Sequence, residues 1–463
     1  MSFVAYDIGF LVLFTLFVVK FLHKRRNNLK RQGLMYLYRT RVGINFIEKF
    51  SSKYYRILKP MQYVIVACGY LLMGFMLWML ARIVYLYSTS DKFITLTKIP
   101  PVLPLVPYLP SIFKVDFLPP FYFTYWILII AVVALVHEFA HGIFARLNKI
   151  KVHSTGFGFL GPFLAAFVEP DERQMQKAKK FPQLAILAAG TFSNILVMLA
   201  FMIIIVIFFM MFFVPAGVNF NTYATAAVNV SAITSINGVA LNQLSTLNNS
   251  IATITAGNLS FFAPGDSVQK AIASKVPYVI MYEDAPAIRA KLKWPITEFG
   301  EKKVTSPEQL KEAISNSLPN QIVTITTRED GHDGSYDIKL GERNGKAYLG
   351  IGLVEPNNGK IGTFVYKAVS TFKKPFVYYE PRLLGDFAEF IYDLFWWMIL
   401  INMSVALVNM LPVGMFDGGR FFYLTIWGIT GSEKAARNSF KIATWLILAS
   451  LVWLMVRWAL VYY

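Results

Sequence analysis

The stretch AVVALVHEFAHGIFAR, residues 131–146, combines a long apolar pattern with a cluster of ionisable side chains. His137 and His141 are four residues apart, so on a helix both imidazoles lie on one face, with Glu138 beside them. Zinc accepts such nitrogen ligands and lowers the pKa of a bound water, and an adjacent glutamate can take the proton that the water loses. The alternative interpretation is a polar cluster that hydrogen-bonds to neighbouring helices.

The composition indicates that this stretch lies in a bilayer. Of the 463 residues, 56% are hydrophobic and 16% are charged, whereas soluble domains have about a quarter of their residues charged. Because ionisable residues inside a membrane span are costly, they mark a functional site by default. Six apolar runs are long enough to cross a hydrocarbon core, and they cover roughly residues 5–23, 61–87, 119–147, 181–214, 388–411 and 442–462.

The first run, the single cysteine and the proline-rich segment after the second run further limit the topology and the kind of site. In the first run the basic residues follow the apolar stretch, and no small-residue cleavage site appears, so we expect a retained anchor with its N-terminus outside. The one cysteine, Cys68, lies in the second run, which excludes a disulfide framework and a cysteine-based metal site. The segment 98–120 is apolar but rich in proline, and we expect it in the outer interface rather than across the membrane.

The net charge of +18 is concentrated in three loops. Residues 24–59 have eleven Lys or Arg and one acid, residues 146–180 have seven and three, and residues 420–441 have four and one. By the positive-inside rule we expect these loops in the cytoplasm and the nearly neutral segment 215–387 outside. The charge thus indicates topology and contact with anionic lipid, and we expect no nucleic-acid partner. Three glycosylation sequons agree with an outer location, at Asn229, Asn248 and Asn258.

A third metal ligand is needed, because two histidines and a water leave a tetrahedral zinc one protein ligand short. His137 lies roughly 16 residues into its run, or about 24 Å, and hence near the cytoplasmic side. The fifth run ends NMLPVGMFDGGRFF (409–422), which places Asp417 at that depth, where a proline and a glycine pair would turn the carboxylate inward. The alternative is an interfacial turn residue, as Asp-Gly often is. The rival ligand, His153, follows a basic stretch, and we expect it to be solvated.

These motifs resemble the site-2 protease family of intramembrane zinc proteases. The resemblance rests on HEFAH at 137–141 and on the spacing of Asn409, Pro412 and Asp417-Gly418, with support from AAGTFSN (188–194) and GFGFLGPFLAAFVEPDE (156–172). It implies that His137, His141 and Asp417 bind Zn²⁺ and that Glu138 is the general base. It also implies a membrane-embedded β-hairpin at 156–168.

Two asparagines match positions that family members place near the metal. By the resemblance, Asn194 and Asn409 would donate to the developing oxyanion or hold the substrate backbone. The alternative for both is hydrogen bonding between helices, which apolar spans commonly use. The sequence departs from the family pattern at Thr191, where proline is frequent, and at Phe416, where leucine is usual; neither change removes a chemical group.

The outer segment 215–387 reads as a separate α+β region. SPEQLKEAI (306–314) has a serine cap, a proline at the next position and helical spacing, and QIVTITT (321–327) alternates like a half-buried strand. Residues 283–355 resemble the PDZ module that many site-2 proteases have outside the membrane, and SAITSINGVAL (231–241) resembles a PDZ strand and turn. A PDZ groove would bind peptide by strand addition, and the alternative is a folded cap without a peptide ligand.

The sequence therefore predicts a multi-pass α-helical membrane protein with about six transmembrane helices, a membrane-embedded β-hairpin and an extracytoplasmic α+β PDZ-like domain. The domains are expected to be N-terminal helices and loops, a catalytic membrane core in two parts, and the outer region between those parts, at residues 1–118, 119–214 with 388–463, and 215–387.

The predicted function is an intramembrane zinc metalloprotease in the cell membrane, with its active site near the cytoplasmic side. Its partners would be the lipid bilayer and a membrane-protein substrate, which the resemblance implies is already trimmed by another protease. One alternative is a scaffold or chaperone of the same fold that has lost hydrolysis. The other is a metal transporter, although such proteins tend to have internal repeats and none is evident.

Overall fold

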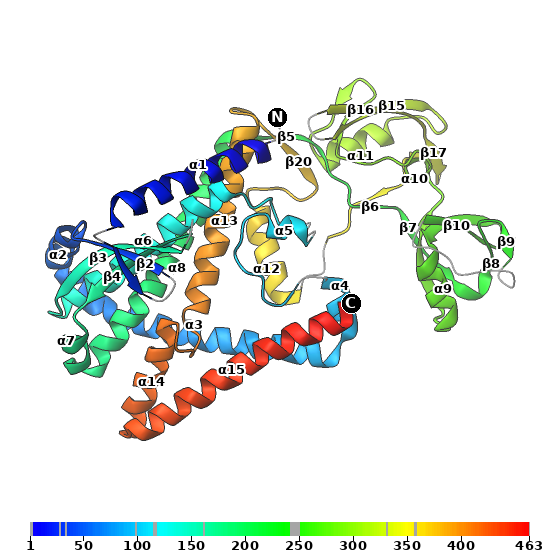
Figure 1. Cartoon of the computed structure of the whole chain (residues 1–463). Helices are drawn as coiled ribbons and strands as arrows, with labels where there is room; N and C mark the ends of the chain where they lie inside the picture. The colour runs from blue at the N-terminus through cyan, green and yellow to red at the C-terminus, as the bar shows by residue number, and fades with distance from the viewer. Residues whose placement is uncertain are drawn as a thin grey trace. The chain divides into compact units, whose positions relative to one another are not determined.

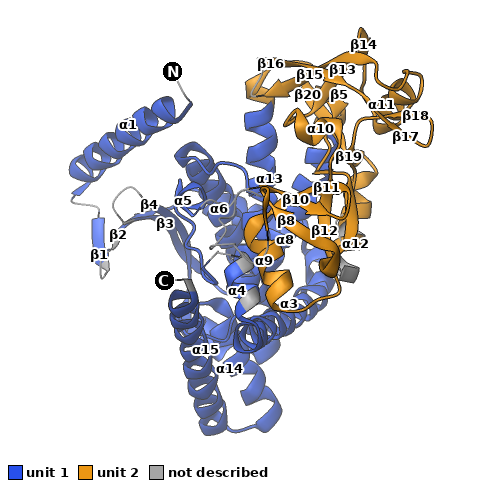
Figure 2. Ribbon diagram, turned by 90° about the vertical axis from the view of Figure 1, so that its right-hand side faces the viewer, with its two compact units in different colours: residues 1–207, 389–463 blue, residues 208–388 orange. Residues whose placement is uncertain are grey.

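The computed structural model describes residues 3–26, 29–32, 35–97, 100–113, 118–160, 163–240, 251–329, 332–355 and 359–462. The chain forms two compact units (Figure 2). The first comprises residues 1–207 and 389–463, and the second comprises residues 208–388. The sequon at Asn248 lies outside the described residues.

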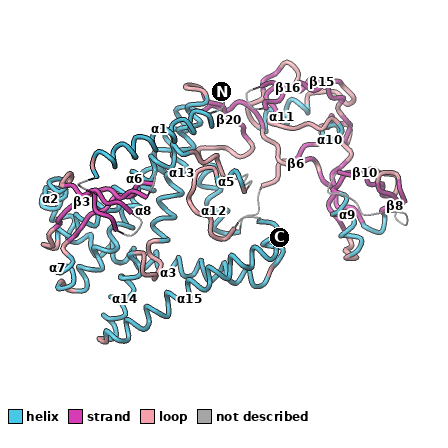
Figure 3. The backbone as a smooth tube through the Cα atoms, viewed as in Figure 1, coloured by secondary structure: helices cyan, strands magenta, loops and turns pink. Residues whose placement is uncertain are grey.

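Long apolar helices make up most of the first unit (Figure 3). Within the described residues, six helices are long and apolar enough to cross a membrane, which agrees with the six runs expected. The third begins at Phe123 rather than 119, because a proline pair precedes it, and the fifth ends at Val408, ahead of Pro412. The six are α1 (Phe3–Lys24), α3 (Tyr55–Thr89), α6 (Phe123–Leu147), α8 (Lys180–Phe212), α13 (Asp386–Val408) and α15 (Glu433–Tyr462).

A four-stranded antiparallel sheet lies beside α6, labelled β2, β3 and β4 in Figure 1. Its strands follow in the order β1 (Leu29–Gln32), β2 (Met35–Thr40), β3 (Val152–Leu160) and β4 (Phe163–Pro170). The hairpin of β3 and β4 falls where the resemblance implied one, and its place in the membrane stays a prediction. The addition of β1 and β2 was not expected, because residues 24–59 were interpreted as a basic loop. Consequently β2 pairs with one edge of the hairpin, whereas β4 has no second strand partner within the described residues and packs against α6.

The short helix α2 (Ile44–Lys53) packs against the back of α6. Gly43, with φ +89°, lies so close to Phe139 that an added Cβ would come within 2.5 Å of the ring. At Gly142 a Cβ would come within 2.9 Å of Ile47, so glycines on both helices permit the contact.

A buried carboxylate ties α1 to α6. Asp7, 1% exposed, accepts hydrogen bonds from the backbone N–H groups of Phe123 and Thr124 at 2.7 and 2.8 Å. The hydroxyls of Thr124 and Tyr108 also donate to it. Asp7 thus caps the first turn of α6 from another helix, where those N–H groups have no partner within α6.

Three further short helices complete the described part of the first unit apart from the site. They are α4 (Asp91–Thr97), α5 (Leu109–Ile112) and α7 (Glu172–Lys177). The proline-rich segment contains α5, and its described part has no spanning helix, as expected. Its relation to the outer interface stays a prediction.

The second unit contains two six-stranded antiparallel sheets. The first has the order β7-β12-β11-β10-β8-β9 and packs on α9 (Gly265–Ala273). Its hairpin turns at Asn237 and Gly238, both with positive φ, which is the chemistry expected of an Asn-Gly turn. The strand bounds are β7 Thr225–Asn229, β8 Ile233–Ile236, β9 Val239–Ala240, β10 Ile251–Ala256, β11 Leu259–Pro264 and β12 Tyr278–Glu283.

The second sheet has the order β16-β15-β13-β5-β20, with β14 paired to β13. Helix α11 (Pro307–Ser315) begins as the sequence predicts, with Ser306 accepting the N–H of Gln309. A PDZ likeness of this region stays a prediction. The strands are β5 Phe213–Val218, β13 Ile296–Phe299, β14 Lys302–Lys303, β15 Ile322–Glu329, β16 His332–Lys339 and β20 Val377–Pro381. Smaller elements are β6 Thr222–Tyr223, α10 Pro286–Arg289, β17 Gly341–Arg343, β18 Lys346–Tyr348, β19 Ile351–Gly352 and α12 Gly359–Ser370.

Candidate metal centre

The two histidines of α6 converge as their spacing predicts. His137 and His141 are 7% and 9% exposed, and their Nε2 atoms are 3.0 Å apart. Glu138 lies beside them, and one donor atom from each of the three residues falls within 4.8 Å of the others. The helix therefore brings two imidazoles and a carboxylate to one point on its buried face.

Asp417 reaches the same point from the other end of the chain. Its Oδ2 atom is 3.2 Å from Nε2 of His137 and 3.2 Å from Nε2 of His141. It is the first residue of α14 (Asp417–Thr430), after the break that follows α13. The structure thus brings Asp417 to a histidine, His137, that lies 280 residues earlier in the sequence.

Glycines allow the turn that presents Asp417. The N–H of Gly418 donates to the carbonyl of Asn409 at 2.7 Å, which closes the break between α13 and α14. An added Cβ at Gly418 would come within 2.3 Å of the Met410 backbone, and one at Gly419 within 2.3 Å of the Val413 carbonyl. The glycine pair is therefore required for this close approach, and the helix break has the role predicted for it.

Helix α8 closes the site at Gly190. An added Cβ there would lie 2.5 Å from Nε2 of His141 and 2.6 Å from Nε2 of His137. The motif AAGTFSN therefore contributes a bare stretch of backbone at the imidazoles, a role that the sequence analysis did not foresee.

Hydrogen bonds behind the imidazoles orient them. Nδ1 of His141 is 2.7 Å from the carbonyl of Ile186, which can only accept, so Nδ1 has the hydrogen and Nε2 keeps its lone pair. Nδ1 of His137 lies 3.1 Å from the side-chain amide nitrogen of Asn194, while the buried Oδ1 of Asn194 has no partner within the described residues. Exchanging the amide O and N would satisfy Oδ1 and free Nε2 of His137 in the same way.

The donor set fits zinc. Two imidazole nitrogens and one carboxylate oxygen are preferred zinc ligands, with bonds of about 2.0–2.2 Å. On a tetrahedron such ligands stand roughly 3.3 Å apart, and the separations here are 3.0, 3.2 and 3.2 Å. Three protein ligands leave a fourth position open, which is the pattern of a catalytic site.

Glu138 points to the sheet rather than to Asp417. Its Oε2 accepts the backbone N–H of Val168 in β4 at 2.9 Å. The edge of β4 that has no second strand partner within the described residues therefore lies beside the metal centre. No local sequence signal could have revealed this contact, because it joins a helix and a strand 30 residues apart.

The remaining candidates occupy different settings. Asn409 is half-buried and holds Gly418 through its carbonyl, and the role of its amide stays a prediction. His153 lies on β3, is 49% exposed at its side chain and pairs with Asp171 at 3.0 Å, so it is not brought to the histidine pair. A hydrogen bond from the N–H of Gln174, together with His153, lowers the pKa of the Asp171 carboxyl.

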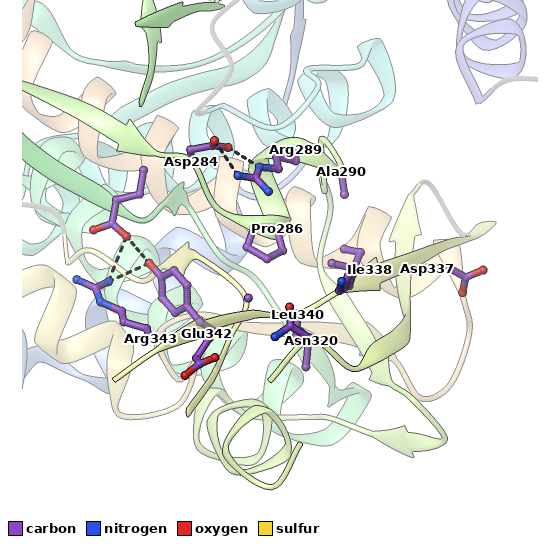
Figure 4. A pocket seen from close by; sticks show the side chains of 14 residues that line it. Asp284, Pro286, Arg289, Ala290, Asn320, Asp337, Ile338, Leu340, Glu342 and Arg343 are labelled. Atoms are coloured by element: carbon purple, nitrogen blue, oxygen red, sulfur yellow. Dashed lines mark hydrogen bonds and ion pairs between the residues drawn. The ribbon is translucent and has the colours of Figure 1, made fainter. Parts of the chain in front are cut away.

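The second unit has a polar cavity of about 690 Å³ between α10 and the turn after β16 (Figure 4). Arg289 faces Asp284 there, at 2.5 and 2.8 Å. The hydroxyl of Tyr348 donates to Glu283, next to Asp284 in sequence, at 2.6 Å, and burial together with this bond raises the pKa of Tyr348 to about 12. These charges are satisfied by one another, so we assign the cavity no role.

Comparison with known families agrees with the metal centre. The model of peptidase family M50 matches residues 125–326 and 352–454, which include α6, α8, α13 and α14. No curated protein gave a significant match to the chain. Because the family match covers well over half of the sequence, the chain belongs to peptidase family M50, the site-2 protease family of membrane-embedded zinc metalloproteases.

Proposed function

We propose that this protein hydrolyses peptide bonds in or near the transmembrane segments of membrane-tethered proteins, with zinc as its cofactor. The observation that carries the proposal is that Asp417, from α14, meets His137 and His141 beside Glu138 on the apolar spanning helix α6. Costly ionisable groups at this depth are expected only where chemistry requires them.

His137, His141 and Asp417 would hold the metal. When bound, zinc supplies Lewis acidity, which polarises a carbonyl and lowers the pKa of a water. The Ile186 carbonyl and the Asn194 amide would keep both imidazoles in the tautomer that binds metal. In this proposal Asn194 acts through His137, which favours positioning over contact with the oxyanion.

Glu138 would act first as the general base and then as the general acid. Its carboxylate takes a proton from the attacking water as the oxygen adds to the scissile carbonyl carbon. It then gives that proton to the amine as the C–N bond breaks, so that one water is consumed and two chain ends form. Asn409, at the other side of the break before Asp417, is the candidate donor to the oxyanion.

The free edge of β4 is the proposed place for the substrate. Backbone groups alternate along a strand, so the N–H groups of Ala166 and Leu164 face the same side as that of Val168, which donates to Glu138. A helical substrate shields its own amides and must unwind before it is cut. An unwound segment could pair with this edge and pass directly beside Glu138.

The proposed membrane topology is inferred from the distribution of basic residues among the loops. From the basic loops we expect the metal centre near the cytoplasmic side of the cell membrane and the second unit outside. There the PDZ-like region would filter substrates by binding their trimmed ends. The inactive scaffold and the transporter remain the alternatives, and hydrolysis or metal flux distinguishes them from a protease.

The test is proteolysis by the purified full chain in liposomes containing a single-span substrate protein. Wild type is expected to cut within or beside the span, and Glu138→Gln to reduce cleavage by at least about 100-fold, as expected for loss of a general base. Zinc content should be the same for both. Equal cleavage by Glu138→Gln would remove Glu138 as the base, and no cleavage of any substrate by zinc-loaded wild type would favour the scaffold.

A further inference from the structure

An apolar groove runs along the back of the metal-binding helix. It has a volume of about 530 Å³ and is formed by α2, α3, α6 and α8. Phe139 and Ala140, which lie between the two histidines in sequence, line it together with Val136, so it lies on a different face of α6 from the metal centre. The hydroxyl of Ser193, also in the lining, already donates to the Gly190 carbonyl at 2.7 Å.

The length of the groove matches one leaflet of a bilayer. Along α6 its lining extends from Phe144 to Leu135, nine residues apart, which is about 14 Å of helix. The hydrocarbon core is about 30 Å thick, so a groove of this length that begins at the surface of the core would reach roughly to its middle. A single acyl chain fits this depth, whereas a transmembrane helix would require the whole thickness.

One end of the groove has a positive rim. Phe46 and Phe50 of α2 line the groove, and Lys49 and Lys53 occupy the same helix face at the intervening spacings. Both lysines are exposed, and neither forms an ion pair within the described part of the chain. The one acid on this helix, Glu48, is already paired with Arg146 at 2.9 Å.

Aromatic rings line this rim. Phe46 lies 5.5 Å from Phe50, which lies 4.7 Å from Tyr54, and the Lys53 ammonium is 5.3 Å from the Tyr54 ring. An amphipathic helix with aromatic and basic residues is typical of the headgroup boundary. The apolar groove and its positive rim are thus arranged like the acyl chain and the charged headgroup of an anionic phospholipid.

We propose that this groove binds one acyl chain of an anionic phospholipid, whose headgroup phosphate is held by Lys49 and Lys53. Such a lipid would pack against Phe139 and Ala140 and so support α6 from behind. The proposal does not depend on proteolysis, and it can fail or succeed whether or not the chain is an enzyme.

The test is lipid binding to the detergent-purified full chain, measured by native mass spectrometry with phosphatidylglycerol and phosphatidylcholine as probes. Wild type is expected to retain one phosphatidylglycerol with at least about tenfold preference, since each lysine near a headgroup contributes roughly fivefold. Lys49→Glu with Lys53→Glu should abolish the preference. The matched control is Lys434→Glu with Lys441→Glu, two exposed lysines of α15, which should keep it.

A second pair of variants tests the groove itself. Leu196→Trp fills its deep end and should reduce binding of both lipids, whereas Leu199→Trp, on the same helix and similarly exposed at 46% against 48%, should not. Equal phosphatidylglycerol binding by both lysine variants, or by both tryptophan variants, would overturn the proposal. So would displacement of the lipid by inorganic phosphate alone, or selective occupation of the groove by a transmembrane peptide.

Discussion

The main chain of α8 passes both imidazoles at Gly190 with no room for a side chain. We expect Gly190→Ala to weaken zinc retention and to lower stability by about 1–3 kcal/mol, because the methyl group must push the histidines apart. Zinc per chain and the melting temperature measure both effects.

Gly74 in α3 is the matched control, since an added Cβ there meets nothing within 4 Å. Gly74→Ala should bind zinc normally and be neutral or stabilised by up to about 1 kcal/mol. A Gly190→Ala protein that holds zinc and melts like wild type would show that α8 is not seated against the histidines.

Asn194 offers a residue-level test of metal positioning without loss of a ligand. Asn194→Leu removes the polar partner of His137 Nδ1, and such partners typically contribute 10–100-fold to metal affinity. Competition with a chelator of known affinity measures the change. Asn402→Leu is the control, at a buried asparagine whose amide donates to the Met398 carbonyl in the same helix, and it should leave zinc affinity unaltered. The same loss in both variants would point to general destabilisation.

The candidate ligands could be predicted from sequence because their signals are local. His137, Glu138 and His141 share one turn of helix, and Asp417 follows a proline and precedes two glycines at a matching depth. The contact of Gly190 with the imidazoles could not be predicted, because it depends on how closely two helices pack. The hydrogen bond between the Asn194 amide and Nδ1 of His137 could not be predicted either, for the same reason.

At the scale of elements, β4 is the edge on which the substrate proposal depends. Ala166→Pro removes an outward N–H while leaving the ladder to β3, since proline is tolerated on an edge strand with its nitrogen facing out. We expect proteolysis to fall by about tenfold or more, because the substrate loses one hydrogen bond and the edge is distorted. Zinc content should be unchanged. Ala166→Val keeps the N–H and is the control; equal cleavage by the two variants would argue against strand addition at β4.

The pairing of β3 with β4 agrees with what the family resemblance implied, its place in the membrane stays a prediction, and the added strands β1 and β2 were not expected. Residues 156–168 contain alternating glycine and apolar residues that match a family motif, whereas LKRQ in β1 is four polar and apolar residues with no pattern of its own. Short strands depend on the partner that they meet, so their propensity says little. The spanning helices, by contrast, follow from run length alone.

At the scale of the whole molecule, the proposed metal ligands all lie in the first unit, residues 1–207 and 389–463. Removal of zinc with a chelator should therefore destabilise that unit alone, by about 2.7 kcal/mol where zinc had been present at 100 times its dissociation constant. Hydrogen exchange should speed up in α6 and α14 and stay constant in β13 and β15. Uniform acceleration across both units would contradict a metal site confined to the first.

The separation of the proposed ligands also bears on how the protein is made. When His141 is added to the nascent chain, the third ligand is still 276 residues from being translated. Throughout synthesis of α8, of residues 208–388 and of α13, the nascent chain has only two of the three proposed ligands and would not hydrolyse its neighbours at the translocon. Completion of the catalytic centre would thus coincide with insertion of the last helices, so that only a finished molecule is competent to cut.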